Sequence, residues 1–465
     1  MGRFFILIVL FLNLIKVSII YFYYIKNKNK SINHNFYNKV ILYFLFTSII
    51  FSGFLVNIFR LLSDSHILSN YNVGPDEILK VEVFEFISST IFIFCTFYFT
   101  NFIQYKNTNL KRNNYAKDLF ILFLFNIFSI INLFVTNSEN SFLFSELFEF
   151  LAGPSSILLI FYCFKFNKRK YLFIAIPLIS LVIFKIFTGG NRGPLIGIFF
   201  IILFLFINDN YSLNSILKRI PIFLLPIVLV LLLNKEYSKI KIAFTTAYVS
   251  NPKEYQTISD LATFVIDYYK SDRSSEIEGS DTNFFNEYEF RFGAKSMYSV
   301  GFLRFVDRYN YTFFTPIINT LYIFIPRAYF SENKPYPDSY NGEISGMGMY
   351  VCVNEIDGEN FMSEYYPSTH YFWQFGYIGI FILPIISALY IFIIAFLSKN
   401  MNSIIKLLFV LIALRPYAFN PQFTISEIIV MFFTKIIPFL IFYFIFNKLF
   451  YFKIWLNKNF SINKI

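Results

Sequence analysis

The chain has 465 residues, of which 56% are hydrophobic, 22% are aromatic and only 15% are charged. A soluble protein of this length needs more charged surface to cover its cores, so the composition excludes an ordinary soluble protein and favours one with many membrane spans. The net charge of +11 would suggest a nucleic-acid ligand for a soluble chain. Here the basic residues fall between apolar runs, and we expect no nucleic-acid partner.

Apolar runs recur from one end of the sequence to the other, and most have about the 17–25 residues that a bilayer requires. The predicted spans lie near 4–25, 40–60, 83–103, 118–136, 146–164, 172–187, 194–208, 220–234, 372–397, 404–420 and 425–446. The predicted fold class is therefore all-α, a polytopic transmembrane helical bundle of about eleven helices in a lipid bilayer.

Lysine and arginine gather in alternate connections between these spans. The basic connections run from Lys26 to Lys39, Lys106 to Lys117, Lys165 to Lys170, Lys218 to Arg219 and Lys399 to Lys406. The tail that follows the last span is basic too, whereas the remaining connections are acidic or short. Because an excess of Lys and Arg marks the cytoplasmic side, the pattern predicts an exterior N-terminus and a cytoplasmic C-terminus.

One connection is far larger than the others. Residues 235–371 would form a periplasmic or extracellular loop domain between N-terminal transmembrane helices at 1–234 and C-terminal transmembrane helices at 372–465. Structureless loops of this length are uncommon, so we expect a folded cap with short helices. Its apolar stretch at 313–325 is too short to cross and favours an interfacial or re-entrant helix. If this stretch did cross, every later span would be inverted.

The cysteines indicate no disulfide or metal chemistry. Cys95 and Cys163 fall inside predicted spans, and Cys352 stands alone outside them. Three scattered cysteines have neither the pairing of a disulfide framework nor the spacing of metal ligands. We expect no cofactor.

A glycine-rich turn carries an arginine at the predicted exterior boundary. The stretch FTGGNRGPLIG at 187–197 places Arg192 between two spans, with Pro194 suited to the first turn of the next helix. A helix N-terminus, free backbone amides and a guanidinium together favour an anion. Lys185 lies about two turns earlier, near the same surface. The alternative is an arginine that only reaches the lipid headgroups.

More cations follow at the same predicted boundary. The stretch IPRAYFSENKP at 325–335 contains Arg327 and Lys334, and Arg415 lies near the outer end of a late span. Arginines on the exterior side run against the usual orientation of charge, and a guanidinium is well matched to pyrophosphate. These residues therefore predict a binding site for a lipid-linked pyrophosphate.

A histidine and several aromatic residues stand where the exterior segment re-enters the bilayer. In SEYYPSTHYFWQFGYIG at 363–379, His370 is placed to accept a proton from a hydroxyl near neutral pH, with Glu364 as the substitute base. The alternative interpretation is an interfacial belt residue beside Tyr and Trp.

Three stretches, TGGNRGPLIG, IPRAYFSENKP and HYFWQFGYIGIF, together with one large exterior loop late in the chain, resemble the Wzy-type oligosaccharide repeat-unit polymerases of O-antigen, capsule and exopolysaccharide assembly. The last stretch is also similar to the related O-antigen ligases. The resemblance implies a GT-C-like fold and a bacterial cytoplasmic (inner) membrane location.

The resemblance implies a metal-independent inverting glycosyltransferase. The glycan on undecaprenyl pyrophosphate would pass to a new lipid-linked repeat unit, and the leaving pyrophosphate would be stabilised by Arg192 and Arg327, with Lys334, Arg415 and Lys185 in support. His370 or Glu364 would be the catalytic base, and Tyr366 and Trp373 would stack on sugars. The resemblance leaves room for a chain-length regulator as a protein partner.

Two alternatives remain open from the sequence. One is the ligase that transfers finished glycan to another acceptor. The other is a flippase for lipid-linked oligosaccharides, because Lys16 and Lys435 lie within predicted spans and buried charge is typical of transport pathways. The large exterior segment argues against the flippase.

Overall fold

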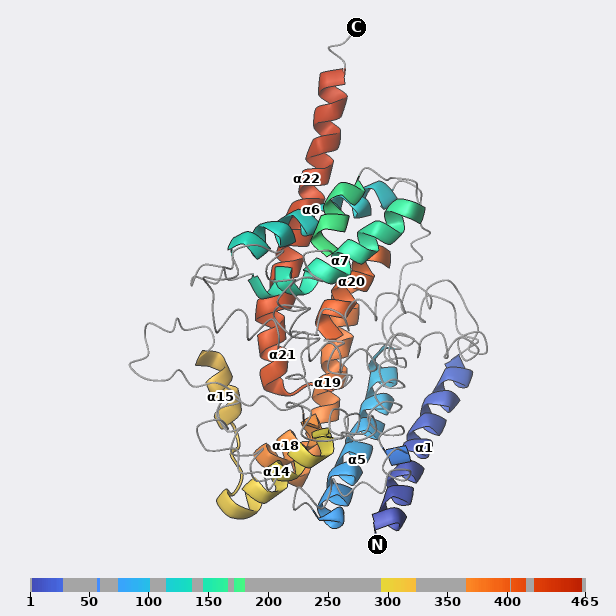
Figure 1. Ribbon diagram of the computed structural model, residues 1–465, viewed down its shortest axis with the longest axis vertical. Coiled ribbons are helices and arrows are strands. Elements are labelled where there is room, and N and C mark those ends of the chain that lie inside the picture. The colour runs from blue at the N-terminus through green and yellow to red at the C-terminus, as the bar shows by residue number, and fades with distance from the viewer. Residues whose placement is uncertain are drawn as a thin grey trace, which may run out of the picture. The chain divides into compact units, whose positions relative to one another are not determined.

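In a computed structural model, the structure describes residues 2–27, 57–58, 74–100, 114–135, 145–165, 171–179, 294–322, 365–401, 403–414 and 422–461. The regular secondary structure in these ranges is helical, with no strand among them (Figure 1). The helices are α1 (Gly2–Asn27), α5 (Pro75–Thr100), α6 (Asn114–Val135), α7 (Ser145–Lys165), α14 (Ala294–Tyr309), α15 (Thr315–Leu321), α18 (Pro367–Phe375), α19 (Tyr377–Ser398), α20 (Ser403–Leu414), α21 (Ile425–Met431), the π-helical turn η8 (Phe432–Ile436) and α22 (Ile437–Ser461). The all-α prediction is confirmed for this part of the chain.

Three of the described helical segments are long and apolar enough to cross a membrane: Phe4–Phe22, Tyr377–Ser398 and Ile425–Ile454. They coincide with the first predicted span and with two of the last three. Helices α5, α6 and α7 also lie at predicted spans. The predicted spans near 194–208 and 220–234 lie outside the described residues, as do most of 40–60 and the second half of 172–187.

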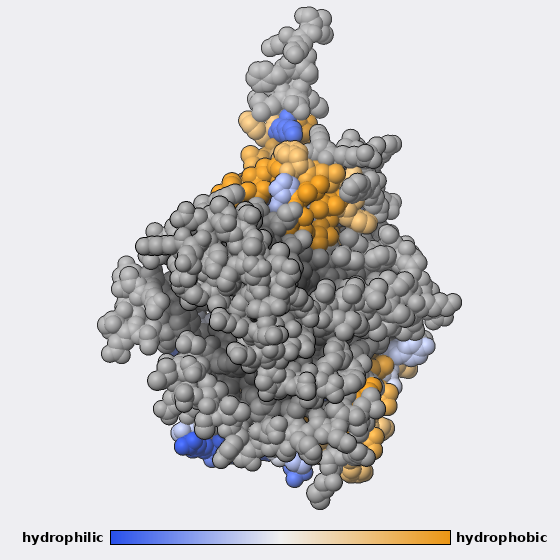
Figure 2. Space-filling view, in the orientation of Figure 1, coloured by the Kyte–Doolittle hydropathy of each residue, from blue (hydrophilic) through white to orange (hydrophobic). Residues whose placement is uncertain are grey.

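Large apolar side chains are exposed on these apolar helices, among them Phe4 and Phe11 on α1 and Phe444 on α22. Figure 2 shows hydrophobic surface among the described residues both where α22 lies in Figure 1 and along the edge where α1 lies. Apolar side chains that face outward on long helices are typical of contact with lipid.

The chain divides into two compact units. The first comprises Met1–Asn107, Thr282–Asn400 and Ala413–Phe433, and the second comprises Thr108–Asp281, Met401–Ile412 and Thr434–Ile465. The predicted boundaries at 234 and 371 are a different division, and they stay predictions. The candidate site described below lies entirely within the first unit.

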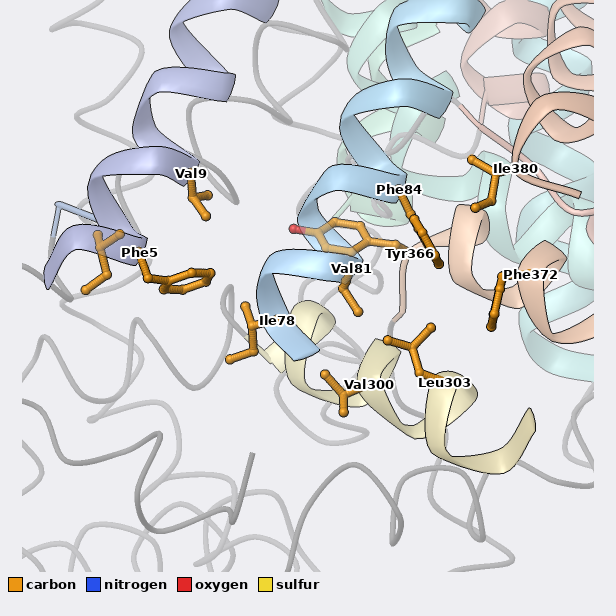
Figure 3. Close-up of a cluster of buried hydrophobic side chains, with 11 residues drawn as sticks. Phe5, Val9, Ile78, Val81, Phe84, Val300, Leu303, Tyr366, Phe372 and Ile380 are labelled. Atoms are coloured by element: carbon orange, nitrogen blue, oxygen red, sulfur yellow. The ribbon is translucent and has the colours of Figure 1, made fainter. Parts of the chain in front are cut away.

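In the first unit, α5 packs against α1, α14, α18 and α19. Figure 3 shows the cluster of buried hydrophobic side chains that joins these five elements. Its labelled members are Phe5 and Val9 of α1, Ile78, Val81 and Phe84 of α5, Val300 and Leu303 of α14, and Tyr366, Phe372 and Ile380 on or beside α18 and α19. This packing brings α5 and α14, which are far apart in sequence, against α18.

A sharp break separates α18 from the membrane-length helix α19. Gly376 has φ +65°, a left-handed conformation that glycine adopts without strain. At Gly379, an added Cβ would lie 2.2 Å from the carbonyl oxygen of Tyr371, so only glycine allows the two helices to approach this closely. The predicted span near 372–397 is therefore observed as α19, starting at Tyr377, with α18 as a separate helix before it.

The second unit has its own polar and aromatic packing. Asn126 of α6 donates a hydrogen bond to Ser155 Oγ at 3.2 Å and accepts one from Ser156 Oγ at 2.8 Å, which joins α6 to α7. The rings of Phe125 and Phe439 stack with their centroids 5.0 Å apart, which joins α6 to α22. Polar contacts of this kind hold apolar helices together because hydrophobic burial adds little in lipid.

Candidate functional site

His370 lies on α18 inside a shell of aromatic rings. The ring of Tyr365 stacks on the imidazole with a centroid distance of 5.4 Å and an interplanar angle of 8°. Trp373 approaches edge-on at 5.0 Å, and Phe302 of α14 does so at 5.5 Å. We call Phe302, Tyr365 and Trp373 the aromatic shell. It leaves His370 with only 2% of its surface exposed.

Burial determines the charge of this histidine. Removal from water lowers the pKa of His370 from 6.5 to about 3, so the imidazole is neutral at physiological pH. Its Nδ1 atom has no hydrogen-bond partner among the described residues. A neutral imidazole with a free nitrogen accepts a hydrogen bond well, but it keeps a proton poorly in such dry surroundings. A proton taken by His370 would therefore need a nearby negative charge or a rapid onward transfer.

Gln374 follows His370 by one helical turn, so the two side chains share a face of α18. Gln374 is 1% exposed, and its side-chain oxygen Oε1 has no hydrogen-bond partner within the described part of the chain. This residue was not among the predicted site residues. The spacing of four residues from a candidate base was the available signal, but glutamine in an apolar stretch is not by itself diagnostic.

The loop that follows α14 closes the end of α18. The Thr312 N–H donates to the Trp373 carbonyl oxygen and the Phe313 N–H donates to that of Gln374, both at 3.1 Å. Asn310 and Phe313 have positive φ angles of 71° and 50°, which side chains rarely adopt. The loop thus donates hydrogen bonds to carbonyl groups that have no partner within the last turn of α18. These bonds also fix the position of α14 relative to α18.

Tyr366 and Ser368 turn toward α5 and meet two carboxylates. The Tyr366 hydroxyl donates to Glu82 Oε1 at 3.3 Å, and Ser368 Oγ donates to Glu85 Oε2 at 2.8 Å. The Tyr366 N–H donates to Ser299 Oγ of α14 at 2.9 Å. The ring of Tyr366 belongs to the hydrophobic cluster of Figure 3 rather than to the aromatic shell.

A lysine on α1 completes this group. Lys16, Glu82 and Glu85 are 5%, 5% and 8% exposed, and both carboxylates act electrostatically on the ammonium of Lys16. We call Lys16, Glu82, Glu85, Tyr366 and Ser368 the carboxylate network. Of these residues, Lys16 stood out in the sequence as a charge within a predicted span, whereas Glu82 and Glu85 did not. Their spacing of three residues was a usable signal, because it places both on one face of a helix.

An ion pair fixes α14, and with it Phe302 of the aromatic shell. Arg304 donates from Nε to Glu77 Oε1 at 2.7 Å and from Nη2 to Glu77 Oε2 at 2.6 Å. Partial burial alone would raise the pKa of Glu77, but the hydrogen bonds from Arg304 and the Gly74 N–H, with the arginine's charge, lower it below its ordinary value. Glu77 is therefore a carboxylate at neutral pH, and the pair ties α14 to the start of α5.

Of the predicted site residues, the structure brings His370 and Trp373 together, whereas the Tyr366 hydroxyl contacts Glu82 of α5. The predicted cations and the second candidate base lie outside the described residues: Arg192, Arg327, Lys334, Arg415, Lys185 and Glu364. Within the described ranges, no three His, Cys, Asp or Glu side chains gather as metal ligands.

No protein-family model matches the chain, and neither a curated protein nor a solved structure is significantly similar to it.

Proposed function

We propose that this protein is a glycosyltransferase that polymerises undecaprenyl-pyrophosphate-linked oligosaccharide repeat units into a bacterial surface polysaccharide. The growing glycan is transferred, with inversion at its anomeric carbon, to the non-reducing end of a new lipid-linked repeat unit. Undecaprenyl pyrophosphate leaves. The reaction takes place at the outer face of the cytoplasmic membrane, in a GT-C-like bundle of about eleven helices. A chain-length regulator is a candidate protein partner.

The observation that supports this proposal most directly is the state of His370. It is a neutral imidazole surrounded by rings, shortly before a membrane-length helix, and its Nδ1 has no hydrogen-bond partner in the described part of the chain. Such a group accepts the proton of a sugar hydroxyl while that oxygen attacks an anomeric carbon, and aromatic faces suit the apolar faces of sugars. The low basicity of the buried imidazole fits a proton transfer that takes place together with the attack.

The leaving group is the part of the reaction that needs cations. Pyrophosphate gains negative charge as the glycosidic bond breaks, and fixed guanidinium groups lower the energy of that state. Arg192 and Arg327 have this role in the proposal, with Lys334, Arg415 and Lys185 in support, so no metal ion takes part. Glu364 is the substitute base.

The first test is the surface glycan of cells that carry single variants. Arg192→Ala and His370→Ala should each lower the yield of long chains by about 100-fold or more, while single repeat units still accumulate on the carrier lipid. Asp76→Ala, which alters an exposed residue at the start of α5, should leave the chain-length ladder unchanged. Normal ladders from Arg192→Ala and His370→Ala would rule out these roles.

A ligase is the nearest alternative, because the stretch around His370 is similar to that of the ligases as well. A deletion strain separates the two. Loss of a polymerase leaves one repeat unit on the final acceptor, whereas loss of a ligase leaves finished polymer on the carrier lipid.

A flippase is the alternative that the carboxylate network favours, because buried Lys16, Glu82 and Glu85 resemble the intramembrane charges of transport pathways. Purified protein in detergent distinguishes this alternative, since chain extension there requires no translocation. Extension of lipid-linked repeat units by the purified protein would exclude a flippase, and translocation in vesicles without extension would exclude the polymerase.

A further inference from the structure

Two buried polar atoms without partners lie one turn apart on the same face of α18. They are Nδ1 of His370 and Oε1 of Gln374, and neither has a hydrogen-bond partner among the described residues. Their side chains are 2% and 1% exposed, so bulk water does not supply the missing hydrogen bonds. Unsatisfied polar atoms in a protein interior are rare and cost stability, and a pair on one helix face indicates a site that is completed by a ligand.

The chemistry around these atoms selects the kind of ligand. The groups that the structure places next to His370 are the rings of the aromatic shell, and His370 itself is neutral. A pyrophosphate would lose its hydration here without gaining a cation from these groups. A sugar has apolar faces that pack on rings and hydroxyl groups that donate to a nitrogen and an amide oxygen.

We propose that this face of α18, formed by His370, Gln374 and the aromatic shell, binds an uncharged sugar residue of the acceptor glycan. Its hydroxyl groups donate hydrogen bonds to His370 Nδ1 and to the side-chain oxygen of Gln374. Gln374 is thus a specificity-determining residue that holds the hydroxyl beside the base. The inference rests on the proposed function for the statement that this sugar is the acceptor.

The chain offers an intrinsic probe for this site. It has two tryptophans, and one of them, Trp373, belongs to the aromatic shell. In a Trp455→Phe background, Trp373 is the only source of tryptophan fluorescence. The full-length purified protein is titrated with methyl glycosides of neutral hexoses and N-acetylhexosamines, with methyl glucuronide and with inorganic pyrophosphate. Saturable change with at least one neutral glycoside, and none with pyrophosphate, is the expected result. A response to pyrophosphate alone, or to none of these probes, overturns the proposal.

A matched pair of substitutions distinguishes a ligand site from a structural role. Gln374→Met removes an unsatisfied polar atom and keeps the volume, so it should raise Tm while it weakens glycoside binding about tenfold or more. Gln422→Met makes the same change at a buried glutamine whose Oε1 accepts a hydrogen bond from Ser88 Oγ at 2.8 Å. It should leave glycoside binding intact, so it controls for the effect of a Gln→Met change elsewhere in the interior. A lower Tm for Gln374→Met, or unchanged binding, overturns the inference.

The failure of this inference and the failure of the proposed function give different results. If Gln374→Met binds glycosides like the parent while His370→Ala still abolishes polymer, the polymerase proposal survives and the sugar site is wrong. If glycosides bind through Gln374 but deletion of the gene leaves the surface glycan unchanged, the sugar site survives and the polymerase is wrong.

Discussion

Two faces of α18 differ in whether their buried polar groups have hydrogen-bond partners. On the side of α5, Tyr366 and Ser368 donate to Glu82 and Glu85, and the carboxylates act on the ammonium of Lys16. On the side that carries His370, polar atoms of two adjacent turns lack partners within the described residues. A buried network whose polar groups are all hydrogen-bonded holds helices in one arrangement. Buried polar groups without hydrogen-bond partners lower the stability of the protein, so their presence indicates a role other than stability, such as ligand binding. The contacts with α5 therefore fix the position of α18, and in our proposal the polar atoms on the His370 face bind the ligand.

The largest effect is expected from breaking the carboxylate network. Glu85→Ala leaves Lys16 with one carboxylate instead of two and removes the acceptor of the Ser368 hydroxyl. Removing the charge that compensates another buried charge destabilises a protein by about 3–5 kcal/mol. Thermal and denaturant unfolding of the purified protein in detergent measures the loss.

A second substitution sharpens this test. Lys16→Met in the Glu85→Ala background removes the charge that was left in excess, so it should recover part of the lost free energy of unfolding. Asp76→Ala, at an exposed carboxylate on the same helix, should cost less than about 1 kcal/mol. Similar losses for Glu85→Ala and Asp76→Ala would show that the network does not position α18.

The next largest effect is acid destabilisation through His370. Because burial lowers its pKa from 6.5 to about 3, the unfolded chain binds a proton between these pH values that the folded site excludes. The free energy of unfolding therefore falls as the pH drops below about 6.5, by at most about 1.4 kcal/mol per pH unit and about 3 kcal/mol at pH 4.

Unfolding between pH 7 and pH 4 measures this contribution, with His370→Phe as the comparison. Phenylalanine keeps a ring within the aromatic shell and has no proton to bind. The variant should lose less stability in acid than the parent protein. The same acid dependence in both proteins would contradict the dry environment of His370 and weaken the contrast between the two sides of α18.

The smallest effect is expected at the Arg304–Glu77 pair. Arg304→Lys keeps the positive charge but loses the bidentate hydrogen bonding to the Glu77 carboxylate. The two side chains are 28% and 33% exposed, so solvent screens the pair and the cost in the free energy of unfolding is about 0.5–1 kcal/mol. Unfolding at low and high salt measures it, and the difference from the parent should shrink as salt rises. A loss as large as that of Glu85→Ala would assign the main positioning role to this pair instead.

Much of the fold follows from local sequence pattern. The apolar runs near 4–25 and 425–446 predicted helices of membrane length, and the structure has them at those places. Hydropathy predicts such helices well because a membrane-spanning segment lies in the apolar interior of the bilayer along most of its length. The break at Gly376 was harder to predict, because a left-handed glycine and the close approach at Gly379 depend on which backbone packs against them.

The candidate site was only partly visible in the sequence. The cluster of His370 with Trp373 is local, since both lie on one short helix, and the sequence placed them at the start of a late span. The burial of His370 was not visible, because it depends on Phe302 of α14. Glu82 and Glu85 lie more than 280 residues from the side chains that donate to them, and no local pattern reports a pairing at that separation.

By itself, the sequence determined the helical, membrane-type character of this protein and the presence of a histidine among aromatic residues beside a late span. Hydrophobicity and residue type act locally, so they can be read along the chain. Only the tertiary structure decided which polar groups of α18 are satisfied and which are not. That outcome depends on the side chains that α1, α5 and α14 bring against it, and therefore on contacts between segments that are remote in sequence.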